Sequence, residues 1–198
     1  MSGSPDGFQA SKAALREAVL ARRDQLDPVQ RIEMSIAAAA HGERRIGFDL
    51  GSIVSGFLPI RSELDLRPLM DSLRVRGARL CVPVVIDRQT ITFRELVRGA
   101  ELVKTGFGTV GPGAEATILD PQLLLMPLSV FDRFGNRIGY GAGHYDRAIA
   151  KLRAAGGNPR LIGCGFAMQE ADLVPAEPHD ITMHGVLTEN GYREFGSQ

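Results

Sequence analysis

Residues 123–157 read LLLMPLSVFDRFGNRIGYGAGHYDRAIAKLRAAGG, and this stretch decides the fold class. The apolar run 123–128 predicts a strand that is buried on both faces. A helix is predicted over 144–157, because four apolar residues recur on one face at helical spacing: Tyr145, Ala148, Ile149 and Leu152. A buried strand followed by an amphipathic helix is typical of an α/β fold.

Helices alternate with apolar strands along the rest of the chain. Residues 11–41 predict a helix that Asp27 and Pro28 interrupt, because Asp is a favoured N-cap and Pro is tolerated in a first turn. Residues 64–77 predict a further helix, and strands are predicted at 51–60, 78–85, 90–96, 160–166 and 185–189. We therefore expect a three-layer α/β sandwich, with a mostly parallel sheet, helices on both faces and an N-terminal helical segment.

Two segments carry no helix or strand pattern. The polar residues 1–10 predict a disordered tail, which leaves 11–198 as a single α/β domain. Residues 104–121 are rich in Gly and Pro and predict an irregular surface loop or an active-site wall.

Composition limits the classes of partner. The 198 residues include 23 basic and 23 acidic ones, and a chain without net charge is a poor coat for nucleic acid or for an anionic membrane. No apolar run has the length of a membrane span, and the N-terminus lacks the apolar core of a signal peptide. Cys81 and Cys164 lie in apolar runs and read as buried thiols. We expect a cytoplasmic protein, and a monomer is favoured although the sequence does not determine the oligomeric state.

Two glycine clusters compete as ligand-binding loops. GFGTVG at 106–111 matches the GxGxxG dinucleotide pattern, but Pro112 and Gly113 follow at once and no helix opens there. That pattern has meaning only between a strand and a helix, so a dinucleotide site is disfavoured.

The second cluster, Gly139, Gly141 and Gly143, lies between a strand and a helix. Backbone N–H groups can converge there, and the start of the helix adds its own free N–H groups and positive dipole end. Arg137 and Arg147 add charge, and Asp146 can cap the helix or bind a cation. From glycine spacing alone, an anion site and a tight turn with a capping Asp are equally compatible.

Three more charged residues are candidates of lower specificity. Lys12 and Arg16 lie at i and i+4, so both extend from one helix face opposite the apolar stripe. An ordinary solvated face explains them equally well. Glu63 follows a predicted strand end, where open α/β sheets gather ligands, although a helix-capping role would place it there too.

Taken in order, these segments resemble the 5-formyltetrahydrofolate cyclo-ligase family, also called methenyltetrahydrofolate synthetases. The family's markers are an N-terminal KxxxR, a P-x-x-x-E at a strand end and FD-x-x-G-x-R-[LI]-G-x-G-x-G-x-Y-D. This chain has KAALR at 12–16, PIRSE at 59–63 and FDRFGNRIGYGAGHYD at 131–146. A VP…HD…LTE ending also matches, so the resemblance covers nearly the whole chain.

The resemblance implies a three-layer α/β sandwich and an enzyme that converts 5-formyltetrahydrofolate to 5,10-methenyltetrahydrofolate while hydrolysing ATP to ADP and phosphate, with Mg²⁺. In that reaction ATP phosphorylates the formyl oxygen, N10 of the folate attacks the activated carbon, and phosphate leaves. For this reaction a protein mainly has to position two ligands and neutralise phosphate charge.

The resemblance also assigns residues. ATP should be bound by Lys12, Ala13, Ala14, Leu15, Arg16, Arg137, Ile138, Gly139, Tyr140, Gly141, Ala142, Gly143, His144 and Tyr145. The folate should be bound by Leu58, Glu63 and the loop from Tyr140 to His144. Asp146 should bind Mg²⁺, and His184 is the weaker candidate for a second metal ligand. No residue is assigned to proton transfer.

Three positions depart from the family pattern: Gly111, Gln122 and His184. The third matters most, because the family commonly has there an Asp that is its second magnesium ligand, and imidazole is a poor ligand for Mg²⁺. We therefore keep two further hypotheses beside an active cyclo-ligase. One is a folate- or nucleotide-binding paralogue with weak turnover, and the other is an RNA-associated module, which the absence of net charge disfavours.

Overall fold

One seven-stranded sheet forms the centre of the protein. The computed structural model describes residues 5–177 and 180–196 of the chain. The sheet consists of β1 (Ile53–Ser55), β2 (Arg79–Val85), β3 (Ile91–Glu95), β6 (Leu123–Pro127), β9 (Arg160–Cys164), β10 (Gly185–Thr188) and β11 (Gly191–Glu194). Their order is β11-β10-β9-β6-β1-β2-β3. The five central strands are parallel, and β3 and β11 are antiparallel edges.

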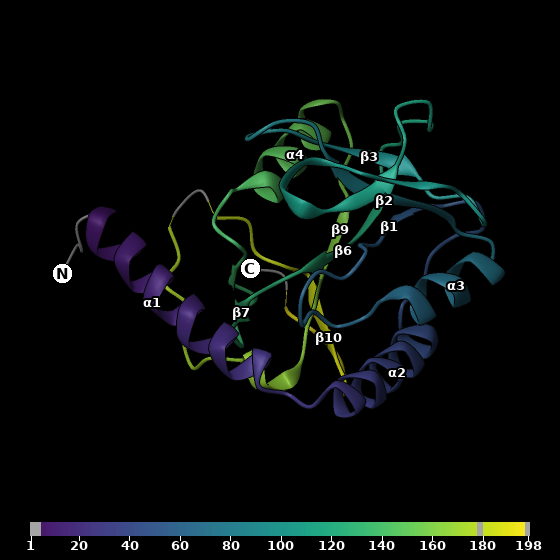
Figure 1. Ribbon diagram of the computed structural model, residues 1–198. Helices are drawn as coiled ribbons and strands as arrows, with labels where there is room; N and C mark the ends of the chain where they lie inside the picture. The colour runs from purple at the N-terminus through teal and green to yellow at the C-terminus, as the bar shows by residue number, and fades with distance from the viewer. Residues whose placement is uncertain (1–4, 178–179, 197–198) are drawn as a thin grey trace.

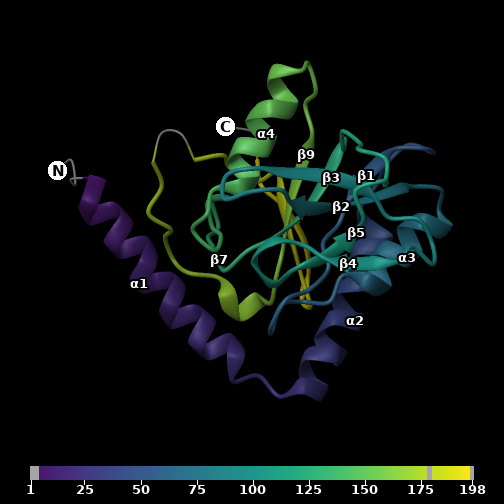
Figure 2. The same ribbon diagram turned by 45° about the horizontal axis from the view of Figure 1, so that its top comes forward.

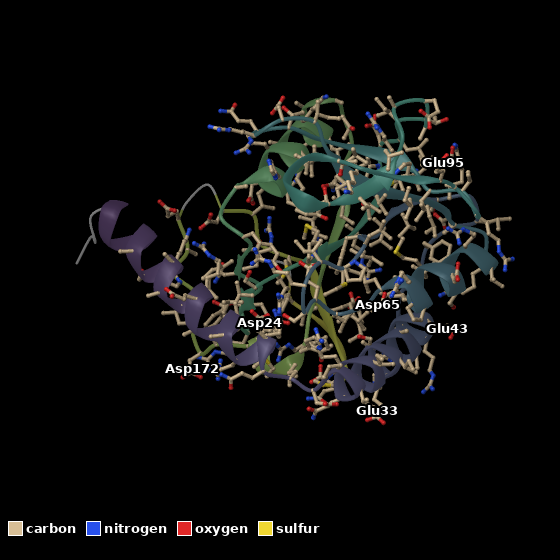
Figure 3. The ribbon with its side chains drawn as sticks, viewed as in Figure 1. Asp24, Glu33, Glu43, Asp65, Glu95 and Asp172 are labelled. Carbon is tan, nitrogen blue, oxygen red and sulfur yellow. The ribbon has the colours of Figure 1, made fainter. Side chains whose placement is uncertain are left out.

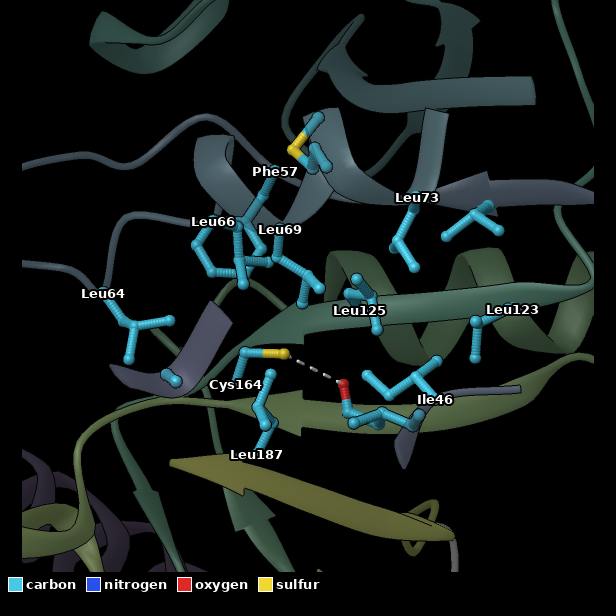
Figure 4. Packing of buried hydrophobic residues seen from close by; sticks show 14 of the residues in the cluster. Ile46, Phe57, Leu64, Leu66, Leu69, Leu73, Leu123, Leu125, Cys164 and Leu187 are labelled. Carbon is cyan, nitrogen blue, oxygen red and sulfur yellow. Dashed lines mark hydrogen bonds between the residues drawn. The ribbon is translucent and has the colours of Figure 1, made fainter. Parts of the chain in front are cut away.

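Helices cover both faces of this sheet, as predicted (Figure 1). The two faces are covered by α2 (Pro28–Arg45) with α3 (Arg67–Val75) on one side and by α4 (His144–Ala154) on the other. Alternate residues of β6 enter the two cores: Leu123 and Leu125 pack with α3, and Leu124 and Met126 pack with α4. Figure 4 shows the first of these cores, where α3 lies over β6. The predicted three-layer α/β sandwich is therefore confirmed.

The N-terminal helix α1 (Pro5–Asp24) lies outside the three layers (Figure 2). It meets α2 at a short turn, where the Asp27 carboxylate accepts hydrogen bonds from two backbone N–H groups and Pro28 opens the new helix. Val19 packs with Val130 and Ile138, which belong to the small hairpin of β7 (Val130–Phe131) and β8 (Arg137–Ile138). The helix predicted over 11–41 and its interruption at residue 27 are thus confirmed.

Several predicted boundaries need correction. Residues 5–10, assigned to a disordered tail, are helical, while residues 1–4 lie outside the described part of the chain. The strand predicted over 51–60 is confined to β1. The stretch 104–121, predicted to be irregular, contributes to a hairpin of β4 (Leu102–Lys104) and β5 (Val110–Pro112) joined by the 3-10 turn η1 (Gly106–Gly108). A second 3-10 turn, η2 (Ala167–Gln169), follows β9.

Other sequence predictions agree with the structure. Cys81 and Cys164 are buried free thiols, and burial raises the pKa of Cys81 to about 12. Over the ranges 5–177 and 180–196, no helix is long and apolar enough to cross a membrane.

Candidate active site

A cavity of about 470 Å³ opens at the carboxyl ends of the parallel strands. The chain runs from β1 to β2 on one side and later returns to place β6 on the other side of β1. Such a switch point leaves a crevice between the segments that leave the two strands. Phe57 and Leu58, which follow β1, and Pro127 at the end of β6 all line the cavity.

Helix α1 contributes two cations to this cavity, Lys12 and Arg16. The Lys12 side chain is only 11% exposed, and its Nζ donates to Glu177 Oε2 at 2.9 Å and to Asp180 Oδ2 at 2.6 Å. Burial by itself lowers the pKa of Lys12. The hydrogen bonds to Asp180 and Glu177 raise this pKa by more than burial lowers it, so the net shift is upward. Lys12 therefore does not lie on an ordinary solvated helix face.

The other three residues of the KAALR motif do not line the cavity. Ala13 and Ala14 are exposed, and Leu15 packs beside the cluster that attaches α1 to the β7–β8 hairpin. The structure therefore brings only the two charged ends of the motif into the cavity.

The glycine loop forms the opposite wall, since every residue from Arg137 to Arg147 lines the cavity. Gly141 has φ +96° and Gly143, the N-cap of α4, has φ +65°, so both need the left-handed conformation that glycine allows. A Cβ on Gly141 would lie 3.2 Å from Nη1 of Arg16. The loop and α1 therefore approach each other closely. Helix α4 begins at the cavity, so the N–H groups of its first turn lie there.

Arg137 connects the loop to the C-terminal segment. Its Nη2 donates to Asp146 Oδ1 at 2.7 Å, and its Nη1 donates to the backbone oxygen of Ile181. Asp146 lies in the first turn of α4 and its side chain is 42% exposed, so the carboxylate can accept a further partner. Arg147 donates instead to the backbone oxygens of Gln89 and Ala142. It thus ties the helix start to the turn between β2 and β3.

Glu63 is the buried carboxylate of the cavity. Its Oε2 accepts the N–H of Ile60 at 2.9 Å, and its Oε1 is buried without a hydrogen-bond partner among the described residues. Burial raises the pKa of Glu63, and the Ile60 amide, the Tyr140 hydroxyl, Arg23 and Arg61 act in the opposite direction. An unpaired oxygen in such a place is costly unless a ligand donates to it.

Two tyrosines extend from the glycine loop and the start of α4. Burial and the neighbouring Glu63 raise the pKa of Tyr140 to about 12, and its hydroxyl accepts from Arg23 Nη2 at 2.9 Å. The Tyr145 hydroxyl is buried and has no hydrogen-bond partner among the described residues. Among the residues that line the cavity, Glu63 Oε1 and Tyr145 Oη are therefore the two buried polar atoms without a hydrogen-bond partner in the described part of the chain.

His184 does not line the cavity, so the structure does not bring this candidate metal ligand to the site. Its Nδ1 accepts the N–H of Leu161, and its backbone N–H donates to Leu161. Leu161 is paired with Leu124 of β6. Leu124 precedes Pro127, which lines the cavity, by three residues, so His184 lies about 10 Å along the strand from the cavity. Burial and the charges of nearby arginines lower the pKa of His184, which favours the neutral imidazole.

The sequence reasoning also missed residues that the structure brings to the cavity. Glu177 and Asp180 are bonded to Lys12, and Thr109 and Val110 of the β4–β5 hairpin lie on the rim. Asp180 is part of the HD pair in the family-like ending, although residues 178–179, which include its His, lie outside the described residues. No other sequence pattern indicated that Glu177 and Asp180 bind Lys12, because helix periodicity does not reveal a partner 165 residues away.

Comparison with known proteins agrees with this geometry. Residues 8–189 match the model of the 5-formyltetrahydrofolate cyclo-ligase family. The chain belongs to that family. It is 32% identical to the 5-formyltetrahydrofolate cyclo-ligase of Mycolicibacterium smegmatis, over 90% of this chain and 93% of the relative. It is 29% identical to the Escherichia coli protein of that name, over 84% and 94% of the two chains.

Solved structures share the fold. The 5,10-methenyltetrahydrofolate synthetase of Aquifex aeolicus has a TM-score of 0.79 at 24% identity and covers 94% of both chains. The Mycoplasma pneumoniae protein of the same name has a TM-score of 0.72 at 20% identity, over 90% of this chain and 98% of that one. Members of the cyclo-ligase family are ligases, and the sequence resemblance and the α/β architecture are both confirmed.

Proposed function

We propose that this chain cyclises 5-formyltetrahydrofolate to 5,10-methenyltetrahydrofolate and hydrolyses ATP to ADP and phosphate. The observation that carries the proposal is one cavity with two chemically different walls. A phosphate-compatible wall consists of α1 cations, loop amides and a helix start, and the other wall ends in a buried carboxylate. Family membership supports the same reaction.

ATP occupies the first wall in this proposal. Lys12 and Arg16 reach toward the loop, where two left-handed glycines expose backbone to a ligand and α4 presents free N–H groups. Charge-assisted hydrogen bonds of this kind are strong and fix the orientation of a phosphate. The residues from Arg137 to Tyr145 and those from Lys12 to Arg16 form this half of the site, with Ala13, Ala14 and Leu15 serving as scaffold.

The folate occupies the second wall. Leu58 offers apolar surface, and Glu63 Oε1 offers an acceptor for N–H groups on the edge of the pterin ring. The loop from Tyr140 to His144 lies between the two halves, so that both ligands contact it. Holding the formyl oxygen beside the terminal phosphate of ATP is the contribution that such a reaction needs most.

The carboxylates of the cavity fit Mg²⁺ bound together with ATP. Asp146 is half-exposed, and oxygen ligands from one or two carboxylates plus phosphates are the usual environment of this ion. Lys12 is already neutralised by Glu177 and Asp180, so a triphosphate gains from arriving with its own cation. Bound there, Mg²⁺ would neutralise phosphate charge while Arg137 orients Asp146.

The alternative of a binding paralogue with weak turnover loses its main support, because His184 lies away from the cavity. We further propose that the protein acts in the cytoplasm and as a monomer, in keeping with the sequence expectation.

The deciding experiment supplies Mg²⁺, ATP and 5-formyltetrahydrofolate and follows the methenyl product by its near-ultraviolet absorbance. ADP is measured in parallel and should appear in a one-to-one ratio with the product. Glu63→Gln keeps the shape of the folate wall but removes its charge, and it should reduce turnover while ATP still binds. A wild-type protein that binds both ligands and forms no product would favour the paralogue instead.

A further inference from the structure

Among the residues that the structure describes, Arg23 is the largest fully buried side chain, with an exposed fraction of 1%. It lies in the last turn of α1. Its Nε donates to Ser62 Oγ at 3.0 Å, and its Nη2 donates to Tyr140 Oη at 2.9 Å. Both of these partners are neutral hydroxyl groups, and Arg23 forms no ion pair within the described residues.

Burial of an arginine side chain costs free energy, because its charge loses contact with water. A guanidinium is always charged, and a buried charge is normally paired with an acid. Asp24, the next residue, does not form an ion pair with Arg23; its carboxylate accepts a hydrogen bond from the Ser62 hydroxyl. Figure 3 shows Asp24 at the end of α1 that faces the body of the protein. The energetic compensation for the buried charge therefore has to come from elsewhere.

Glu63, the carboxylate with the unpartnered oxygen, is a buried acid on which Arg23 acts electrostatically. Burial raises the pKa of Glu63 on balance, and the charge of Arg23 opposes that rise. The other groups that face Glu63 are Arg61 on the same turn, Tyr140 on the glycine loop and Tyr145 on α4. Arg61 is exposed, so water screens its charge, and Arg23 is the buried cation near Glu63.

Both hydroxyl partners of Arg23 belong to segments that touch the folate half of the cavity. Ser62 directly precedes Glu63 in a turn where Arg61 adopts a left-handed φ of +52° and the Ile60 N–H points to the Glu63 carboxylate. Tyr140 belongs to the glycine loop and lines the cavity. One guanidinium therefore joins the two segments that bear Glu63 and the glycine loop.

We propose that Arg23 is a positioning residue of the folate half of the site, which holds the Tyr140 hydroxyl and the Ser62–Glu63 turn together. This inference rests on the proposed function. Arg23 does not line the cavity and acts through Glu63 and Tyr140. Lys12 lies eleven residues earlier, about 16 Å along the same helix. In this proposal, the middle of α1 carries the two cations for ATP, Lys12 and Arg16, and its last turn carries Arg23, which positions the folate half.

The test compares Arg23→Met with Arg22→Met. Methionine approaches the length of arginine without its charge or donors. Arg22 is the matched control, because it is exposed and its Nη2 makes only a long hydrogen bond of 3.4 Å to the backbone oxygen of Met168 among the described residues. Measurements are KM and kcat for 5-formyltetrahydrofolate, the Kd of ATP in the absence of folate, the pH profile of kcat/KM, and the thermal midpoint.

Arg23→Met should raise the KM for the folate about tenfold or more, as expected when a charged hydrogen-bonding group is lost, and should change the Kd of ATP far less. The acid limb of kcat/KM should move to higher pH, because removing Arg23 removes an effect that lowers the pKa of Glu63. Arg23→Lys keeps the charge and should restore the position of the acid limb, but it cannot donate to both hydroxyls and should leave KM raised. Arg22→Met should behave as the wild type in all of these measurements.

A purely structural role gives a different result. Arg23→Met would then lower the thermal midpoint while the folate KM and the acid limb stay at their wild-type values, which overturns the inference. If Arg23→Met does not fold, Tyr140→Phe and Ser62→Ala each remove one partner and leave the charge in place. Both should raise the folate KM, and unchanged values in the pair overturn the inference too. Failure of the proposed function is distinct, since the wild type itself would then form no methenyl product.

Discussion

Replacing Gly141 by alanine should damage ATP binding more than it damages the fold. Gly141 has φ +96°, and an L-residue held in that region loses about 1–2 kcal/mol. For a protein of this size, that loss lowers the thermal midpoint by about 2–8 °C. The new Cβ would also lie 3.2 Å from Arg16 Nη1, so the guanidinium has to shift by a few tenths of an ångström from the position where it faces the loop. Hydrogen bonds to charged groups contribute about 1.5–3 kcal/mol, so ATP affinity should fall about 10- to 100-fold.

Gly156→Ala is the matched control for this prediction. Gly156 follows α4, has φ +90°, and a Cβ there would meet nothing within 4 Å. It should therefore lose a similar amount of stability while its ATP affinity stays at the wild-type value. Thermal unfolding and calorimetric titration with ATP measure the two quantities separately. Equal ATP affinities in wild type and Gly141→Ala would refute the idea that the loop backbone and Arg16 meet at the phosphates, and equal losses in both variants would show a global effect.

Four other variants test the same site. Gly143→Val should abolish ATP binding in a folded protein, because φ is +65° and a Cβ would lie 2.9 Å from Arg147 Nη1; calorimetry that finds ATP bound would contradict this. Lys12→Ala should weaken ATP binding and also lower the free energy of unfolding in urea by about 1–3 kcal/mol, because two carboxylates lose their partner; unchanged stability would indicate a solvated lysine. Asp146→Asn should remove most activity and raise the Mg²⁺ concentration for half-maximal rate, with little change in stability, since its ion pair is half-exposed. His184→Asp should leave the Mg²⁺ curve unchanged, and a curve shifted to lower Mg²⁺ would restore the ligand argument.

The pKa of His184 adds a stability prediction. Its folded-state pKa is lowered, so its contribution to stability is present above about pH 6.5 and is lost as pH falls through the folded-state value. His184→Asn keeps an acceptor for the Leu161 N–H but does not titrate. The variant should therefore lose less stability than the wild type between neutral pH and pH 5, measured as the urea midpoint at each pH. Parallel midpoint curves would show that His184 does not govern the acid-side loss.

The elements that periodicity predicted are those with a strong pattern over several residues. The buried run at β6 and the helix α4 are examples, as is the break at Asp27. The β4–β5 hairpin was missed because both strands have only three residues, β5 contains Gly and Pro, and the hairpin depends on the packing of β5 beside β2. A strand of two or three residues has too little sequence to show a period, so tertiary contacts decide it.

The site shows the same division between local and distant information. The glycine loop was predictable, because its spacing, its flanking strand and its helix lie within one segment. The partners of Lys12 were not, since Glu177 and Asp180 are 165 and 168 residues away and nothing in the helix pattern points to them. His184 is the opposite case. Its position within the family-like ending suggested a place at the site, but its side chain bonds to Leu161 near the amino ends of the strands.

One topological feature explains why these distant segments meet, and it leaves α1 as a special case. The turn with Glu63 follows β1 and the glycine loop follows β6, so both open into the crevice where the strand order reverses. Helix α1 has no strand to place it and depends on side-chain attachments: Lys12 to the C-terminal segment, Val19 to the β7–β8 hairpin and Arg23 to the folate wall. In the proposed function α1 also carries the cations for ATP, and these attachments would then set where the phosphates lie relative to the folate. A small displacement of the helix would therefore separate the reacting atoms while both ligands remain bound, and transfer between them would slow before binding is lost.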